Sequence, residues 1–161
     1  MSADKNWQFE LEEYIKQGEP GQIEKSEAWQ TAIGLQAIDG LQTSAYLLDT
    51  AKEHIEGKIS IDEVQKRIQS YYEQRADRTQ TENDTEEADI VSARITKLLG
   101  EKAFQFSPIE WLTIHRRLFE DVFSHAGQIR QYNITKKEWV LKGDTVTYAS
   151  WNSIKDRKSV V

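Results

Sequence analysis

The stretch from Phe106 to Tyr148 constrains the fold most, because its residues predict a helix, a turn and a hairpin in succession. Ser107, Pro108 and Glu110 form a helix start, with a hydroxyl cap, a proline at the first helical position and a carboxylate three residues after the cap. Apolar residues then recur at spacings of three, four and seven, which predicts one buried stripe. The stripe consists of Ile109, Leu112, Leu118, Phe119, Val122 and Phe123.

We expect this helix to end at Ala126 and Gly127. A hairpin is predicted after it, because β-branched and aromatic residues at 139–141 and 145–148 flank a turn that contains glycine.

The sequence of the first half of the chain predicts several helices, each with recognisable start and stop signals. One short helix lies within residues 1–25, and Gly18, Pro20 and Gly21 are expected to stop it. Residues 26–75 predict three more helices, which start at Ser26, after Thr43 or Ser44, and at a capping box of Ser60 and Glu63. Their expected inward faces are Trp29, Ile33 and Ala37, then Leu47, Leu48, Ala51 and Ile55, then Ile61, Val64, Ile68 and Tyr71. The polar run 76–87 reads as a linker or a frayed helix start, and a helix is expected from about Glu86 to Leu99.

Composition limits the class of protein. The chain has no cysteine, no apolar run near the roughly 20 residues that cross a bilayer, and no signal-peptide core, so we expect a cytoplasmic protein that is not in a membrane.

The net charge of −6 argues against nucleic acid as the main partner. Residues 1–78 hold 15 acids and 9 Lys/Arg, whereas residues 90–161 hold 7 acids and 12 Lys/Arg, so the balances are −6 and +5. The opposite signs suggest either that one half docks on the other or that the solvated faces are simply uneven.

Two segments resemble known families. IHRRLFEDVFSHAGQIRQYNITK, followed by a hairpin and TYAS, resembles the N-terminal half of the Fic domain, over about residues 89–154. WQTAIGLQAIDGLQTSAYLLDTAKEHIEGKISIDEVQKRIQSYY resembles a VbhA-type antitoxin, the small helical protein that silences Fic enzymes, over about residues 26–75.

The antitoxin resemblance implies an inhibitory motif. Such antitoxins carry Ser or Thr, three further residues, Glu, and then Gly or Asn, and the glutamate pairs with an arginine of the Fic catalytic motif. Here Leu35 replaces the hydroxyl residue, Asp39 takes the glutamate position, and Gly40 matches. Aspartate is one methylene shorter, so a bidentate grip on an arginine requires closer approach or is lost. Without the motif, Asp39 is the last polar residue before a glycine helix stop.

The Fic resemblance implies that the hairpin at 136–148 is a flap, which holds the target segment by adding a strand to it. The flap residues are Lys136, Lys137, Trp139, Val140, Leu141, Gly143, Thr145 and Val146. The alternative is that the hairpin only packs on the helices, which is the reading we favour for Tyr148 and Trp151. We interpret Arg130, a basic position in the family, as structural, pairing with a carboxylate or capping carbonyls.

Fic enzymes carry an HxFxxGNGRxxR-like motif that supplies the base, the Mg²⁺ ligand and the phosphate cradle, and this sequence does not contain it. His54, His115 and His125 lack its flanking residues, so we assign no catalytic residue and no metal ligand. ATP and Mg²⁺ are implied only for a complete protein. The last six residues, DRKSVV, have no place in the Fic pattern and match the translation of a sequencing adapter, so we expect residues 156–161 to be a non-biological scar; the alternative is an ordinary polar C-terminus.

The sequence therefore predicts a mainly α protein: a small antitoxin-like three-helix domain, followed by the N-terminal half of a helical Fic domain with a β-hairpin flap. The expected divisions are an N-terminal extension at 1–25, the antitoxin-like domain at 26–75, a linker at 76–87, the Fic segment at 88–155 and the scar at 156–161. By resemblance, the complete protein would transfer AMP from ATP to a Tyr, Ser or Thr hydroxyl of a target protein, with the first domain inhibiting it in cis; this chain alone is expected to be inactive. The alternatives are an antitoxin-like binding protein that silences a separate Fic enzyme, and an unrelated helical interaction module.

Overall fold

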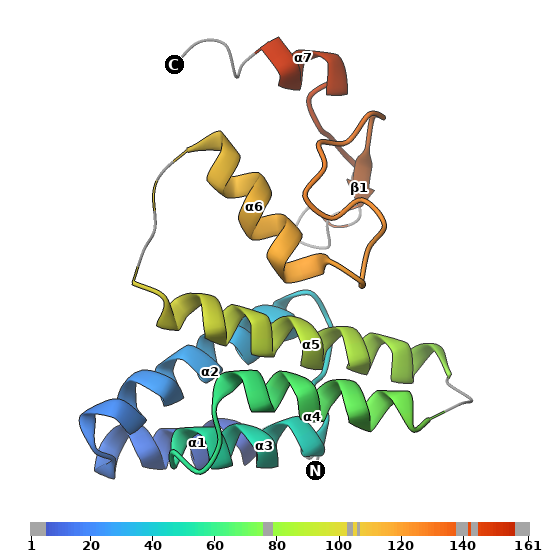
Figure 1. The fold of residues 1–161 in the computed structure, drawn as a ribbon. Coiled ribbons are helices and arrows are strands. Elements are labelled where there is room, and N and C mark those ends of the chain that lie inside the picture. The colour runs from blue at the N-terminus through green and yellow to red at the C-terminus, as the bar shows by residue number, and fades with distance from the viewer. Residues whose placement is uncertain are drawn as a thin grey trace. The chain divides into compact units, whose positions relative to one another are not determined.

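The computed structural model describes residues 6–75, 79–102, 105, 107–137, 142 and 145–156. The chain divides into two compact units, Met1–Phe104 and Gln105–Val161. The described residues are mainly helical, with one two-stranded sheet (Figure 1). None of their helices combines the length and the apolar character that crossing a bilayer requires.

The described residues of the first unit form a bundle of five helices. Figure 1 shows them packed against one another, with α5 in contact with both α2 and α4. The helices are α1 (Asn6–Gln17), α2 (Pro20–Ile38), α3 (Ala45–Ile55), α4 (Ile61–Glu73) and α5 (Gln80–Gly100).

The helix starts predicted for α3 and α4 are confirmed, with Ser44 as the residue before α3 and Ser60 as the residue before α4. Ser44 precedes α3 and its hydroxyl accepts a hydrogen bond of 3.0 Å from the Leu47 N–H. Ser60 caps α4 in the same way, accepting from the Glu63 N–H at 3.2 Å. Each hydroxyl satisfies a backbone donor that the first helical turn leaves without an intrahelical partner.

The start of α2 differs from the expected Ser26. Glu19 is the N-cap and Pro20 is the first helical residue, so the proline expected to stop one helix begins the next. Proline suits this position because its missing N–H would have no partner there and its φ angle is already helical. As a result, α2 runs across the expected division between residues 25 and 26.

The core of the bundle lies where the apolar periodicity predicted it. Trp29 is fully buried between the helices, and Leu11 of α1 joins the same cluster. The other apolar members of the cluster are Ile33, Leu47, Ala51, Ile55, Val64, Ile68, Tyr72 and Ala93. Leu48, Ile61 and Tyr71 are partly buried and pack against this cluster, as expected, whereas Ala37, which was also expected to face inward, is exposed.

The predicted linker 76–87 is helical from Gln80 onward, about six residues before the expected helix start at Glu86. A capping box begins α5: the Thr79 hydroxyl accepts from the Glu82 N–H at 3.3 Å, and the Glu82 carboxylate accepts from the Thr79 N–H at 2.8 Å. This box gives a polar first turn a defined start without apolar periodicity.

The second unit contains α6 (Pro108–Phe119), β1 (Thr135–Lys137), β2 (Thr145–Thr147) and α7 (Trp151–Asp156). The predicted Ser107 cap is confirmed by a 3.1 Å hydrogen bond from the Glu110 N–H. However, α6 ends at Phe119 instead of Ala126, and Asp121 then adopts a φ of 64°, which a helix cannot contain. The predicted buried stripe is also wrong within this structure, since α6 has no buried residue and Ile109 is 76% exposed.

A hairpin is present, and β1 and β2 are antiparallel with Thr135 opposite Thr147, Lys136 opposite Val146 and Lys137 opposite Thr145. The predicted second strand is confirmed at 145–147. The predicted first strand at Trp139–Leu141 lies outside the described residues, and the observed pairing begins earlier, at Thr135. Residues 157–161 of the expected scar also lie outside the described part, whereas Asp156 closes α7.

Candidate functional site

The residues of the expected inhibitory motif form the C-terminal end of α2. Asp39 is the C-cap residue, and Gly40 follows with a φ of 79°, a left-handed conformation that glycine adopts without strain. The Gly40 N–H donates to the Ala37 carbonyl at 3.1 Å and the Leu41 N–H to the Gln36 carbonyl at 2.9 Å. The glycine stop predicted for this helix is therefore confirmed, and both Asp39 and Gly40 are exposed.

Apolar side chains lie exposed beside this helix end. Leu35, one turn before Asp39, is 45% exposed, and Ile38 is 81% exposed. Residues four apart share a helix face, so Leu35 and Asp39 present one apolar and one acidic group on the same side.

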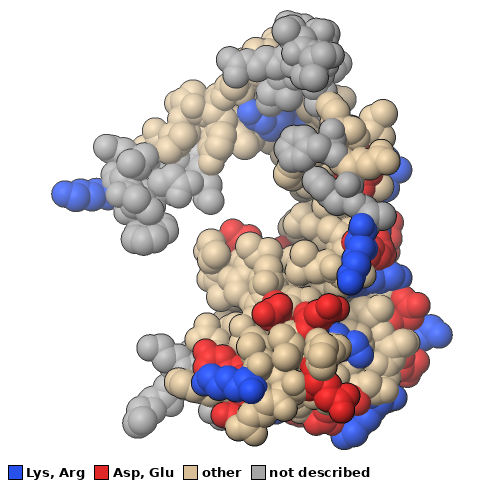
Figure 2. Space-filling view, turned by 90° about the vertical axis from the view of Figure 1, so that its left-hand side faces the viewer, with Lys and Arg blue, Asp and Glu red and all other residues tan. Residues whose placement is uncertain are grey.

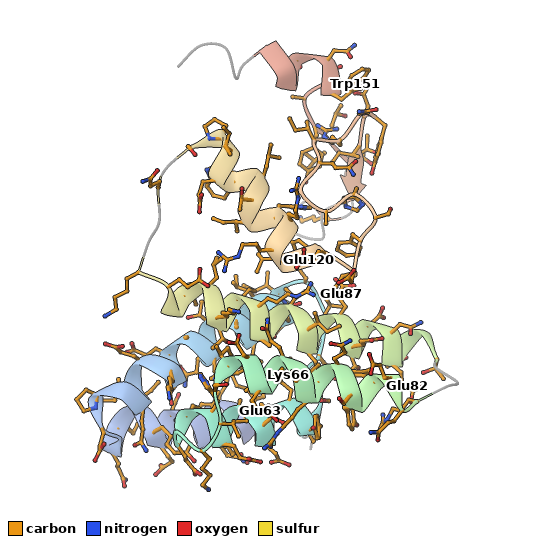
Figure 3. All side chains as sticks on the ribbon, in the orientation of Figure 1. Glu63, Lys66, Glu82, Glu87, Glu120 and Trp151 are labelled. Carbon is orange, nitrogen blue, oxygen red and sulfur yellow. The ribbon has the colours of Figure 1, made fainter. Side chains whose placement is uncertain are left out.

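Helix α5 contributes a second carboxylate to this region. Glu87 lies on α5 (Figure 3), and burial together with repulsion from Asp84 and Asp39 raises the pKa of its carboxyl above the usual value. The charge of Asp39 thus contributes to the raised pKa of Glu87, although 48 residues separate them in the sequence. Sequence reasoning missed Glu87 because the antitoxin-like motif is local.

A buried carboxylate holds α5 against the helices before it. Asp89 is fully buried, and it accepts from the Ser44 N–H at 2.8 Å, the Ser44 hydroxyl at 2.6 Å and the Tyr72 hydroxyl at 2.7 Å. Burial raises the pKa of Asp89, and the three hydrogen bonds oppose that shift by stabilising the charged form. Asp89 thus joins α5 to the cap of α3 and to α4, in a network that sequence reasoning did not find.

His54 is a structural residue of the bundle. Its Nδ1 accepts from the Trp29 indole N–H at 3.1 Å, so the neutral ring carries its proton on Nε2. Burial and the nearby Lys25 ammonium lower its pKa to about 4. Lys25 also donates to the His54 carbonyl at 3.0 Å.

The bundle has a groove of about 690 Å³ between the first half of α2 and the last turns of α5. His54 and the buried Thr96 line it, and the Thr96 hydroxyl has no hydrogen-bond partner. Three lysines and three glutamates line the groove, so its formal charges balance.

In the second unit, a histidine closes the turn after α6. His115 Nδ1 accepts from the Gly127 N–H at 2.8 Å, and its ring lies 6.1 Å from that of His125, centroid to centroid. Gly127 has a φ of 71°, and a Cβ there would meet Arg116 Cβ at 2.7 Å. His115 is a half-buried residue of α6, and His125 belongs to the turn that follows it.

Hydrogen bonds made by the side chains of Arg130 and Asn133 hold the base of the hairpin together. Arg130 donates to the carbonyls of Tyr132 at 3.0 Å and Ala149 at 2.6 Å, which confirms its expected carbonyl-capping role. The Asn133 side-chain oxygen accepts from the Trp151 N–H at 3.0 Å. These bonds connect the segment before β1 to the segment after β2.

Only part of the expected flap can be located. The backbones of Lys136, Lys137, Thr145 and Val146 lie in the paired strands. The other expected flap residues, Trp139, Val140, Leu141 and Gly143, lie outside the described residues. Tyr148, which we expected to pack, is 39% exposed, and Trp151 is half-buried.

The face of the bundle seen in Figure 2 carries acidic and basic side chains close together, without a broad field of one sign. Within the described residues, no three His, Cys, Asp or Glu side chains gather in a way that suits a metal ion. The chain matches no family model, no curated protein and no solved structure.

Proposed function

We propose that this chain is the N-terminal portion of a Fic-type protein AMP-transferase, and that its bundle is the built-in inhibitor. The proposal begins from the ordered resemblance of two consecutive segments, the antitoxin-like 26–75 and the Fic-like 89–154. In such an enzyme, a hydroxyl of the target protein attacks the α-phosphate of ATP, AMP is transferred, and pyrophosphate leaves.

One observation favours inhibition in cis over a separate inhibitor or an unrelated interaction module. Helix α5 contains the start of the Fic-like segment, yet it packs on α2 and α4 and belongs to the same compact unit. Asp89, within that segment, receives hydrogen bonds from Ser44 and Tyr72 of the antitoxin-like segment. Two independent modules joined by a hinge would not share a buried carboxylate of this kind.

The exposed apolar surface of α6 supports the view that the Fic-like unit is one part of a larger fold. Ile109 and Trp111 are 76% and 55% exposed, and the described residues of this unit bury only Gly127. An amphipathic helix normally buries its apolar face against another element.

In this proposal, ATP and Mg²⁺ belong to the catalytic motif of the complete protein, which this sequence does not contain. The described residues hold no cluster of metal-ligating side chains, and the sequence lacks the glycine-rich catalytic motif. Both would be bound by the complete protein, and this chain supplies no step of the transfer.

A second candidate is a protein that silences a separate Fic enzyme. The exposed Leu35 and Ile38 beside Asp39 favour it, since this helix end is accessible to a partner. Both candidates assign the same helix end to inhibition and differ in whether the Fic domain belongs to the same polypeptide.

The test is an AMP-transfer assay with labelled ATP, together with long-read sequencing of the DNA across the codons for 154–161. We expect no transfer by the chain alone and reduced transfer by an added Fic domain that has the complete motif. A reading frame that continues into that motif supports the enzyme fragment, and a genuine stop codon supports the separate inhibitor. Transfer by the chain alone contradicts its assignment as an inactive portion, and an added Fic domain that is unaffected contradicts inhibition.

A further inference from the structure

The groove between α2 and α5 has a floor and a rim of different chemistry. Its buried and half-buried lining residues form the floor and are Lys25, Ala28, His54, Ile61, Thr96 and Lys97. The three glutamates that line the groove, Glu24, Glu27 and Glu101, are all exposed and form part of its rim. These residues all belong to the first compact unit, and the volume of about 690 Å³ lies within the range of small-molecule sites.

His54 contributes an unpaired hydrogen-bond donor to this floor. The residue is only 8% exposed, and its Nδ1 accepts from the Trp29 indole N–H at 3.1 Å, so the neutral ring carries its proton on Nε2. Among the described residues, the structure gives Nε2 no hydrogen-bond partner. An acceptor atom bound in the groove would satisfy this donor.

Lys25 supplies a cation next to this donor. Its Nζ donates to the backbone carbonyl of His54 at 3.0 Å, which uses one of the three ammonium N–H groups. No carboxylate of the described residues forms an ion pair with Lys25. Lys97, the other lysine of the floor, differs, because its Nζ already donates to the Asp62 carboxylate at 2.8 Å. Lys25 is therefore the lysine of the floor whose charge is available to a bound anion.

These two donors are suited to one carboxylate, and another part of the groove is suited to an apolar group. A carboxylate has two oxygens, so it can accept from Lys25 and from His54 Nε2 together. Three residues offer apolar surface and are called the apolar wall here: Ala28 of α2, Ile61 at the start of α4, and Leu99 near the end of α5. A dianion such as phosphate is less well suited, because the three glutamates at the rim would repel it more strongly.

We propose that this groove binds a small organic acid whose single carboxylate bonds to Lys25 Nζ and His54 Nε2 while its apolar body lies on the apolar wall. The site does not depend on the proposed function. Because its lining residues come from α2, α3, α4 and α5, a bound acid stabilises the folded bundle by mass action.

The experiment uses 3-phenylpropanoate as the probe and 3-phenylpropanamide, which has the same apolar body without the charge, as its control. Binding to the full 161-residue chain is followed by NMR at pH 7 through the Trp29 indole N–H, which bonds to the His54 ring. We expect a saturable shift with the acid and about tenfold weaker binding of the amide, because hydrogen bonds to a charged group are the stronger ones. No saturable shift with the acid, or equal affinities for acid and amide, would overturn the proposal.

Two lysine variants test which cation binds the carboxylate. Lys25→Met keeps the aliphatic stem and removes the charge, and Lys97→Met makes the same change at the lysine that is paired with Asp62. We expect Lys25→Met to weaken binding of the acid about tenfold and to leave the amide unchanged, whereas Lys97→Met changes neither by more than about twofold. Damage to the fold would weaken acid and amide alike, so the comparison of the two probes within one variant isolates the carboxylate contact. Equal weakening of acid and amide in Lys25→Met, or equal losses of acid binding in the two variants, would overturn the assignment of Lys25.

Discussion

The Tyr72 hydroxyl donates a hydrogen bond of 2.7 Å to the buried carboxylate of Asp89, from α4 to α5. Tyr72→Phe removes this one donor and keeps the ring in the core. Because hydrogen bonds to a buried charged group are the stronger ones, we expect the free energy of unfolding to fall by about 2 kcal/mol. Urea unfolding followed by circular dichroism measures it.

Tyr71→Phe is the matched control for this change. Tyr71 is the neighbouring residue, half-buried, and its ring stacks on Tyr46 at a centroid distance of 4.2 Å, a contact that phenylalanine keeps. We expect its effect to stay within about 0.5 kcal/mol. Equal effects of the two substitutions would show that Asp89 does not depend on the Tyr72 hydroxyl.

His54 makes the stability of the bundle depend on pH. An unfolded chain protonates this histidine below about pH 6.5, whereas burial and Lys25 lower the folded pKa to about 4. Protonation therefore favours the unfolded chain, and the free energy of unfolding falls as the pH drops from about 6.5 to 4, then levels off. The full effect is about 3 kcal/mol by linkage.

His54→Gln isolates this contribution, because glutamine does not titrate and its amide oxygen is an acceptor for the Trp29 N–H. The raised pKa of Asp89 acts in the opposite direction, so the variant and the unchanged chain are compared at each pH. His125→Gln in the second unit is the control for the loss of a histidine, since it leaves the bond between Trp29 and His54 in place. Parallel curves for the unchanged chain and His54→Gln would contradict the prediction.

Local sequence signals predicted the helix starts at Ser44, Ser60 and Ser107, because a cap depends on residues three positions apart. The start at Thr79 was missed although Thr79 and Glu82 have the same spacing, since the surrounding polar residues suggested a linker. The end of α6 was also missed, because apolar periodicity continues through Val122 and Phe123 while Asp121 turns the backbone out of the helix.

In the candidate site, too, features set by neighbouring residues were predicted, and features that depend on residues far apart in the sequence were not. The stop at Gly40 was predicted, because a glycine that adopts a positive φ ends a helix by itself. Glu87 and Asp89 were not predicted, because their partners lie far away in the sequence; the bonds from Ser44 to Asp89 span 45 residues. The family resemblance remains a prediction, carried by the order and spacing of its motifs.

Gly127 is required by the turn after α6. Its φ of 71° and the close approach of Arg116 leave no room for a methyl group, so Gly127→Ala should open the turn and break the bond to His115 Nδ1. We expect the local opening free energy to fall by about 2 kcal/mol, as measured by amide hydrogen exchange at position 127. Gly100→Ala is the control, because no heavy atom lies within 4 Å of a Cβ there, and it should leave exchange in this turn unchanged.

Arg130 holds the base of the hairpin through one guanidinium fork that reaches the carbonyls of Tyr132 and Ala149. Arg130→Lys keeps the charge, but a single ammonium cannot reproduce the fork, so the hairpin should open more often. We expect the amides of β1 and β2 to exchange about tenfold faster, by hydrogen exchange and NMR, which corresponds to the loss of about one hydrogen bond. Arg116→Lys, an exposed arginine on α6, is the matched control and should leave these amides unchanged. Unaltered exchange in Arg130→Lys would mean that the strand pairing and the Asn133 contact hold the hairpin without the arginine.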